Sequence, residues 1–393
     1  MDTKESSELK KLLVSKENVP SASAPKRKCD STTPKVESRS VGVQTVQSVK
    51  CNVRTADKST NYDSLKLKKS QSTDTETPEK PSLCGATSQT GMESADSLTE
   101  NNLQQRQFFM DLIYNSPKEY LGIPKQFQWV LKYICEQNQN ILSELTLIIT
   151  LSKIKQNGSL RDISVQFEIP SSEITNMFVK GIECLANFFQ NLIYLPAPDQ
   201  IQAQLPHEFK VRYPNVQCIL KSLEIEIKTS PDPLHQAQTW SEEKYGSTLK
   251  YLIGCTPNGF VAFVSKGYGG GISDKDILER SNLTNILPLN AVVMTEWQKN
   301  SFVGVESYLM TKGVRLLRPN HPGINSSTEP AQEQVAQAKA IEFLRVHLER
   351  MTKRLRRFGM LSEVRSKYIG YMDHVLIIAC GLVNLQATLT KNK

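Results

Sequence analysis

The 393-residue sequence lacks the features that mark secreted, membrane-spanning and zinc-binding proteins. Its eight cysteines are scattered singly, so there is no Cys-x-x-Cys pair and no Cys/His cluster with zinc spacing. No apolar run is long enough to cross a bilayer, and the N-terminus is too charged for a signal peptide. We therefore expect a soluble intracellular protein with reduced thiols, no membrane partner, no bound metal and no resident cofactor.

The first hundred residues, 1–100, are poor in aromatic residues and show no sustained apolar period. They are rich in Ser, Thr, Lys, Pro and Asp, so they cannot bury enough apolar surface to offset the entropy of ordering. The composition predicts a disordered tail. Within it, the run Pro25-Lys26-Arg27-Lys28 is of the kind that nuclear importins bind, and the alternative is an ordinary solvated charge cluster. A nuclear protein, or one shared between nucleus and cytoplasm, is expected.

A β-branched segment, residues 40–46, lies inside this polar tail and centres on Val43, Gln44 and Thr45. It resembles the Gln-Thr motifs that add a strand to the sheet edge of a dynein light chain. Residues 87–90 form a poorer second match, and two motifs on one chain can bind a dimeric partner bivalently. The competing interpretation is that Gln-Thr pairs occur by chance in Ser/Thr-rich tails.

Helical periodicity begins near Asn101 and continues to residue 193. Ser143 and Ser159 are placed to cap two helices, and a third helix follows Pro170, so the order is that of a helix-turn-helix unit. In a DNA-reading unit the first turns of the last helix would offer basic and amide side chains to the bases. Here they offer Glu173, Thr175 and Asn176. A structural role is favoured over sequence-specific DNA binding.

The remaining residues, 194–393, contain strand patterns. A strand is predicted over 220–227, and a second strand over 250–254 leads through the turn 256–259 into a third over 260–264. Residues 292–297 and 345–350 form two further segments, a strand and a helix. Asp274 and Asp373 each precede a helical pattern and are predicted to be N-caps, and His347 is predicted to be a packed residue.

Taken together, these segments resemble the DDE superfamily endonucleases, the group of the Harbinger-like transposases and their domesticated relatives. In animals such a domain often follows a zinc-binding THAP domain, whose Cys/His signature is absent here. The resemblance implies an α/β RNase H-like domain over 194–393, a mixed sheet of about five strands with helices on both faces, preceded by the helical unit 101–193 and the tail 1–100. The landmarks are Leu195-Pro196, Tyr213-Pro214-Asn215, Gln238-Thr239-Trp240-Ser241, Pro257-Asn258-Gly259, Tyr268-Gly269-Gly270-Gly271, Ser273-Asp274-Lys275 and Arg345-Val346-His347-Leu348-Glu349-Arg350.

Such enzymes hold two divalent cations between three carboxylates. The family pattern places the three positions on Lys221, Glu296 and Glu349. An ammonium at the first position repels a cation, and the longer side chain at the second fits the octahedral demand of magnesium poorly. Neither Glu224 nor Glu226 replaces the lost aspartate, because neither alternates onto the Lys221 face of a regular strand.

The sequence therefore predicts a transposase-derived protein without nuclease activity that acts as a protein- and nucleic-acid-binding module. One alternative is an active DDE endonuclease that uses Mg²⁺ or Mn²⁺, and another is a client of a dynein light chain. The net charge of +8 permits contact with DNA. The predicted nucleic-acid site comprises Arg350, Lys353, Arg354 and Arg357, whose helical spacing suits sequence-independent contact with a phosphate backbone, and the competing interpretation is a solvated helix face.

Overall fold

In the computed structural model, the described residues are 95–138, 142–295, 299–317 and 349–386. All of them belong to one compact unit that spans residues 59–393. The predicted tail up to residue 94 lies outside the described residues, and with it the basic run and the segment around Gln44. Glu296, Trp297 and His347 lie outside them as well. The predictions made for these residues therefore stay predictions.

The predicted helices of the N-terminal half are confirmed, and their ends follow local capping chemistry. The Ser143 side chain accepts from the Thr146 backbone N–H, and the next helix begins at a capping box between Ser159 and Asp162. Between them the chain turns at Asn157, in the left-handed region at φ 58°. The first helix begins at Ala95, six residues before the start predicted for the folded part. The helices are α2 (Ala95–Asn115), α3 (Pro117–Tyr120), α4 (Trp129–Gln137), α5 (Glu144–Gln156), α6 (Leu160–Phe167) and α7 (Ser171–Gln190), with a 3-10 turn η2 (Lys125–Phe127) before α4.

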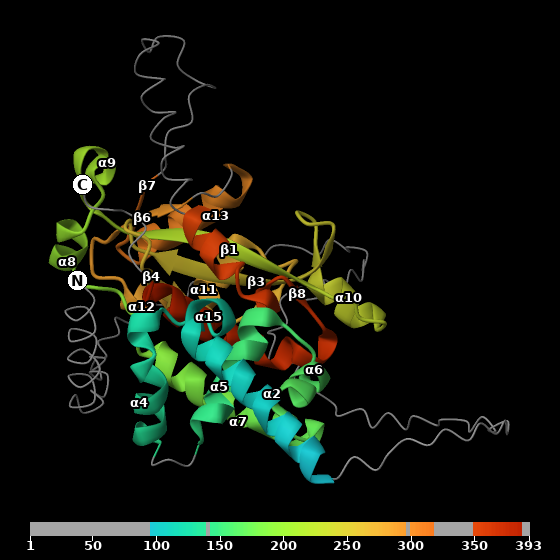
Figure 1. Cartoon of the computed structure of the whole chain (residues 1–393). Coiled ribbons are helices and arrows are strands. Elements are labelled where there is room, and N and C mark those ends of the chain that lie inside the picture. The colour runs from blue at the N-terminus through green and yellow to red at the C-terminus, as the bar shows by residue number, and fades with distance from the viewer. Residues whose placement is uncertain (1–94, 139–141, 296–298, 318–348, 387–393) are drawn as a thin grey trace, which may run out of the picture. The chain divides into compact units, whose positions relative to one another are not determined.

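The C-terminal half is built on a mixed sheet of eight strands, three more than expected, and three of the eight are only two residues long. Its central order is β2-β3-β1-β6-β7, with β4 and β5 on β3 and β8 beside β1 (Figure 1). β1 is antiparallel to β3 and parallel to β6, which is the mixed pairing that the resemblance implied. The strands are β1 (Val216–Ile227), β2 (Trp240–Ser241), β3 (Gly246–Cys255), β4 (Val261–Val264), β5 (Tyr268–Gly269), β6 (Val292–Thr295), β7 (Arg315–Leu317) and β8 (Glu363–Val364).

The predicted hairpin between β3 and β4 is confirmed. The Thr256 N–H donates to the Phe260 carbonyl and the Gly259 N–H to the Thr256 carbonyl, each at 2.8 Å. Gly259 adopts φ +90°, which a residue with a side chain rarely adopts, and this accounts for the glycine of the Pro-Asn-Gly motif. The Asn258 side chain donates to the Gln204 side chain at 2.7 Å, so the turn is also tied to the helical connection before β1.

Helices cover both faces of the sheet. On one face, Leu220 and Leu252 pack with Ile277 and Val305, which lie on α11 (Asp274–Arg280) and α13 (Lys299–Thr311). On the other, α15 (Met372–Asn384) packs against β4 and against α7. The remaining elements are α8 (Pro198–Ala203), α9 (His207–Arg212), α10 (Pro233–Thr239), α12 (Leu283–Ile286) and two 3-10 helices, η3 (Gly359–Leu361) and η4 (Ser366–Tyr371).

Asp373 was predicted to cap the last helix, and this prediction is wrong. The helix begins at Met372, and Asp373 lies in its first turn. Its carboxylate accepts from the Tyr251 hydroxyl at 3.0 Å and from the Gly267 N–H at 3.1 Å. Because Tyr251 is fully buried in β3, its hydroxyl needs a partner inside the fold, and this tertiary demand takes the aspartate away from a local cap. In the described residues, every helix is too short or too polar to cross a bilayer.

Candidate functional site

The first predicted catalytic position, Lys221, lies in the middle of β1, the central strand of the sheet. It is opposite Ile253 of β3, and its side chain is half-buried. On its other side, the parallel register of β1 with β6 places Leu220 opposite Thr295. The described register ends at this pair, and Glu296 lies outside the described residues.

A buried thiol, that of Cys255, lies near Lys221. Burial raises the pKa of Cys255 to about 12, and the nearby positive charge of Lys221 acts in the opposite direction. An ammonium therefore lies close enough to influence this thiol. In a divalent-metal site the same position must supply a negative oxygen ligand.

Glu349, the third position, is half-buried and opens the helical residues 349–355. The predicted helical setting of this glutamate is therefore confirmed. Met351 and Leu355 on the same stretch are buried and attach it to the core. Taken over the described residues, His, Cys, Asp and Glu side chains nowhere gather in a group of three that could hold a metal ion.

The face of the sheet opposite to Lys221 carries a different polar cluster. We call it the Lys250 cluster and define it as Ser222, Lys250 and Asp274. The Lys250 ammonium lies 2.9 Å from Asp274 Oδ1, and the Ser222 hydroxyl donates to the same oxygen at 2.7 Å. The ammonium also donates to the Ile272 carbonyl at 3.3 Å. Both charged side chains are about nine-tenths buried, at 9% and 11% exposure. The cluster fastens α11 to the sheet.

One sequence-based assignment changes because of this cluster, and the expectation for Glu224 holds. Asp274 was predicted to be a helix N-cap, but Ser273 takes that role by accepting from the Asp276 N–H, which leaves the Asp274 carboxylate to pair with Lys250. Glu224 lies in register with Lys250, and its carboxylate accepts from the Thr248 hydroxyl at 3.1 Å. This places Glu224 on the Lys250 face, so it does not replace the aspartate that Lys221 displaces.

The predicted nucleic-acid-binding residues follow Glu349 along the chain. Arg350, Lys353 and Arg357 are exposed, whereas Arg354 is half-buried. Burial lowers the pKa of Arg354 because it desolvates the guanidinium, and the like charge of Arg357 adds to this effect. The regular helix ends at residue 355, so Arg357 does not continue the helical stripe that was predicted.

Lys155 lies beside these basic residues and was not predicted from the sequence to join them. The Lys155 ammonium, from the end of α5, donates to the Arg357 carbonyl at 3.0 Å and lies 5.1 Å from the centroid of the Phe358 ring. Burial lowers the pKa of Lys155, with Glu119 acting in the opposite direction and the positive charges of Arg357 and Lys118 adding to the lowering. Because 202 residues separate the two partners, no local pattern in the sequence joins them.

The helix-turn-helix arrangement of α5, α6 and α7 is present, and its last helix exposes Glu173, Thr175 and Asn176. The Thr175 hydroxyl donates to the Ser171 carbonyl at 2.8 Å and is committed to its own helix. The apolar side of α7 packs against α5 and α15. A DNA-binding unit would pack its apolar side in the same way, so the structural role expected for this unit stays a prediction.

Residues 220–384 match the family model described as DDE superfamily endonuclease. The match begins in the middle of β1, contains all three predicted catalytic positions and the basic residues that follow Glu349, and ends with α15. It does not include the helices α2 to α7. No curated protein and no solved structure matches the chain.

Proposed function

Because residues 220–384 form a DDE superfamily endonuclease domain, we propose that this domain keeps the fold of the family and has lost its nuclease chemistry. The protein then acts as a binding module for protein partners and for the nucleic-acid backbone. The single observation that carries the proposal is Lys221 on the central strand. An ammonium in place of the first carboxylate removes a ligand and adds a repulsive charge of about the size of the attraction that it replaces.

A domain that has lost its nuclease activity can still keep a basic surface that binds a polyanion such as DNA. Arg350, Lys353 and Arg357 remain exposed next to Glu349, and Lys155 adds charge from α5. Contacts from such side chains to phosphates carry no base information, so binding is expected to be sequence-indifferent.

The decisive experiment incubates the purified full-length protein with supercoiled plasmid and with labelled duplex in Mg²⁺ or Mn²⁺. We expect neither nicking nor strand joining. Cleavage that disappears in the Glu349→Ala variant would show that the domain is an active nuclease. Cleavage that persists in this variant would come from a contaminating enzyme and would leave the expected result in place.

A further inference from the structure

A second site lies at the opposite end of the parallel strands, where β1, β6 and β7 begin. Here Val216, Val292 and Arg315 lie side by side in register on the three strands. They form one wall of a pocket of about 270 Å³ whose other wall is α8. Along β1, Lys221 lies four positions beyond Gln217, the last residue of this strand that lines the pocket, which is roughly 13 Å of strand. The ten residues that line the pocket are Pro198, Ile201, Gln202, Pro214, Asn215, Val216, Gln217, Asn290, Val292 and Arg315.

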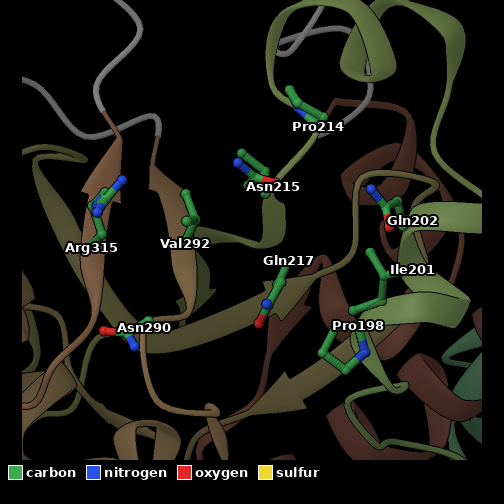
Figure 2. Close-up of a pocket in the computed structure, with 10 residues that line it drawn as sticks. Pro198, Ile201, Gln202, Pro214, Asn215, Gln217, Asn290, Val292 and Arg315 are labelled. Carbon is green, nitrogen blue, oxygen red and sulfur yellow. The ribbon is translucent and has the colours of Figure 1, made fainter.

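The polar lining of the pocket is unusual in composition. Four carboxamide side chains and one guanidinium line it, and none of the ten residues is acidic. Figure 2 shows Asn215 and Gln217 between the strand residues Val292 and Arg315 on one side and the helix residues Ile201 and Gln202 on the other. Amide groups offer donors and acceptors in one plane, and a guanidinium offers a fixed fork of donors to an anion.

Gln217 provides the strongest indication of a ligand. Its Oε1 atom is buried and has no hydrogen-bond partner among the described residues. Gln217 lies at a break in the register of β1 with β6, between Val216 and Cys218, and such bulges redirect a side chain out of the regular alternation. This oxygen is closed to solvent, so a ligand that supplies an N–H group reaches it when the Gln217 side chain turns into the pocket, and the missing hydrogen bond favours that contact.

The ligand must therefore bring a donor to Gln217 on β1 and an anion to Arg315 on β7. These strands are two strand intervals apart, which is about 10 Å. The amide N–H and the carboxylate of a C-terminal residue lie within about 4 Å of each other, so a peptide reaches both ends only when an N–H group further up its chain supplies the donor. A nucleotide carries its base donors and its phosphate at opposite ends of a ribose, and its base edge pairs with amide side chains.

We propose that this pocket binds a single unpaired nucleotide, with the base edge against Gln217 and Asn215 and the phosphate against Arg315. Its volume lies just below the range of about 300–1,000 Å³ that is typical of small-molecule sites, which suits one nucleotide and excludes a duplex. The apolar side chains Pro198, Pro214 and Val292 provide contact surfaces for the faces of the base. The inference does not rest on the loss of nuclease chemistry, because none of the residues that form this pocket takes part in the site around Lys221.

The test is calorimetry or ligand-detected NMR on the full-length protein with adenosine monophosphate as the probe. Adenosine, inorganic phosphate and an acetylated tripeptide with a free carboxylate serve as the comparison ligands. We expect binding of the nucleotide in the millimolar range or tighter, and binding at least about tenfold weaker of each comparison ligand, because each of them engages only one end of the pocket. A phosphorylated single-stranded oligonucleotide should compete with the nucleotide, and a blunt duplex of the same length should not.

Two variants and one matched control assign the binding to the pocket. Arg315→Gln and Gln217→Leu should each weaken nucleotide binding about tenfold or more. Lys244→Gln removes the same charge from an exposed turn between β2 and β3 and should change nothing. Because Gln217→Leu removes an unsatisfied buried oxygen, its melting temperature should hold or rise, which separates loss of binding from loss of folding.

Two results would overturn the proposal. One is nucleotide binding that is absent up to about 10 mM or equal in wild type, Arg315→Gln and Gln217→Leu. The other is tighter binding of the tripeptide than of the nucleotide, which would make the pocket a peptide site. Neither result bears on the cleavage assay, so failure here and failure of the proposed function are distinguishable.

Discussion

Two lysines on neighbouring strands of the same sheet differ in what surrounds them. Lys250 of β3 is 9% exposed in its side chain and is neutralised by Asp274 at 2.9 Å. Lys221 of β1 is half-buried, lies on the opposite face and occupies the position where the family pattern has its first catalytic carboxylate. The first lysine is part of the architecture, because its charge is compensated within the fold. The second is placed at a position whose original chemistry required the opposite charge.

The difference bears on the proposed loss of nuclease chemistry, because the two positions tolerate a change of charge differently. Removing one member of a compensated buried pair leaves an unpaired charge and destabilises the fold, whether or not the domain is catalytic. A half-buried catalytic position tolerates replacement, because solvent and neighbouring groups can accommodate the new charge. The comparison therefore predicts large effects on stability at the Lys250 cluster, and effects on metal binding without loss of folding at Lys221.

The largest effect is expected for Asp274→Asn, which leaves the Lys250 ammonium buried without its counter-charge. We expect a loss of about 3–5 kcal/mol in the free energy of unfolding, measured by urea denaturation. The matched control is Glu279→Gln on the same helix, which breaks the exposed pair of Lys275 and Glu279 at 3.5 Å and should cost at most about 1 kcal/mol.

The double variant Lys250→Met/Asp274→Leu sharpens this test. Replacing both charges by apolar groups should recover most of the loss, because no uncompensated charge remains. If Asp274→Asn and Glu279→Gln had equal effects, the buried pair would have no special role.

The second prediction concerns restoring the carboxylates that the family pattern places at positions 221 and 296. Introducing Lys221→Asp together with Glu296→Asp should allow divalent cations to bind near Glu349, whereas the wild-type protein should show no such binding. At a Mn²⁺ concentration of a hundred dissociation constants, binding should stabilise the fold by about 2.7 kcal/mol, measured as a shift in melting temperature.

The control for this repair is Lys221→Asn with Glu296→Asp, which removes the ammonium without supplying a carboxylate at the first position. An equal manganese shift in the control would contradict the assignment of residue 221 as a ligand position. Loss of the shift when Glu349→Ala is added would support the third position in the same experiment.

Much of the fold could be predicted from the sequence because its signals are local. The caps at Ser143 and Ser159 and the Pro-Asn-Gly hairpin each act over a few residues, and all are confirmed. The aspartates at 274 and 373 were assigned wrongly for a common reason. Each looked like a local cap, but each serves a buried partner on β3, and such a partner is visible only when the tertiary contact is known.

The same distinction applies to the candidate sites. The positions of Lys221 and Glu349 followed from a family pattern with fixed order along the chain, whereas Lys155 joins the basic region through a contact across 202 residues. The pocket at the start of β1 combines residues from four elements, and its informative atom, Gln217 Oε1, is notable only because it is buried without a partner. Whether an atom is buried, and whether it has a hydrogen-bond partner, can be seen only in the folded structure.

A third lysine, Lys153 of α5, is also buried. Among the described residues, its hydrogen bonds go to a carbonyl and to an amide side chain and not to a carboxylate. It is 2% exposed and donates to the Gly158 carbonyl at 2.8 Å and to the Asn157 side chain at 3.1 Å. Burial lowers the pKa of Lys153 to about 8, with the like charges of Arg365 and Lys367 adding to the shift and Asp162 opposing it. Because the folded pKa lies below the unfolded value of 10.5, the unfolded state binds more protons between these values, and stability rises with pH there.

From pH 7.5 to 9.5 this rise should amount to about 2 kcal/mol. Five buried or half-buried cysteines, with pKa values raised by burial, act against it, because their thiols ionise in the unfolded state near pH 9. The measurement is therefore the difference between wild type and Lys153→Met, from urea denaturation at several pH values. Parallel pH profiles for the two proteins would show that Lys153 does not titrate in this window.

The smallest effect is expected at the basic residues after Glu349, where the comparison is between an exposed and a half-buried arginine. Arg357→Glu should weaken binding to random duplex DNA and reduce the salt slope by at least about one, because an exposed guanidinium exchanges counterions with phosphate. Arg354→Glu should change the salt slope less and the stability more, since its guanidinium is already partly removed from water. Fluorescence anisotropy across a salt series, with the exposed Lys244→Glu as the control, separates the two.

If affinity and salt slope are unchanged in both arginine variants, this surface does not bind nucleic acid, and the basic stretch is a solvated face that leaves the domain with protein partners. If instead Arg354→Glu has the larger effect on DNA binding, the half-buried arginine must turn outward when DNA binds, and the surface is reshaped by its ligand.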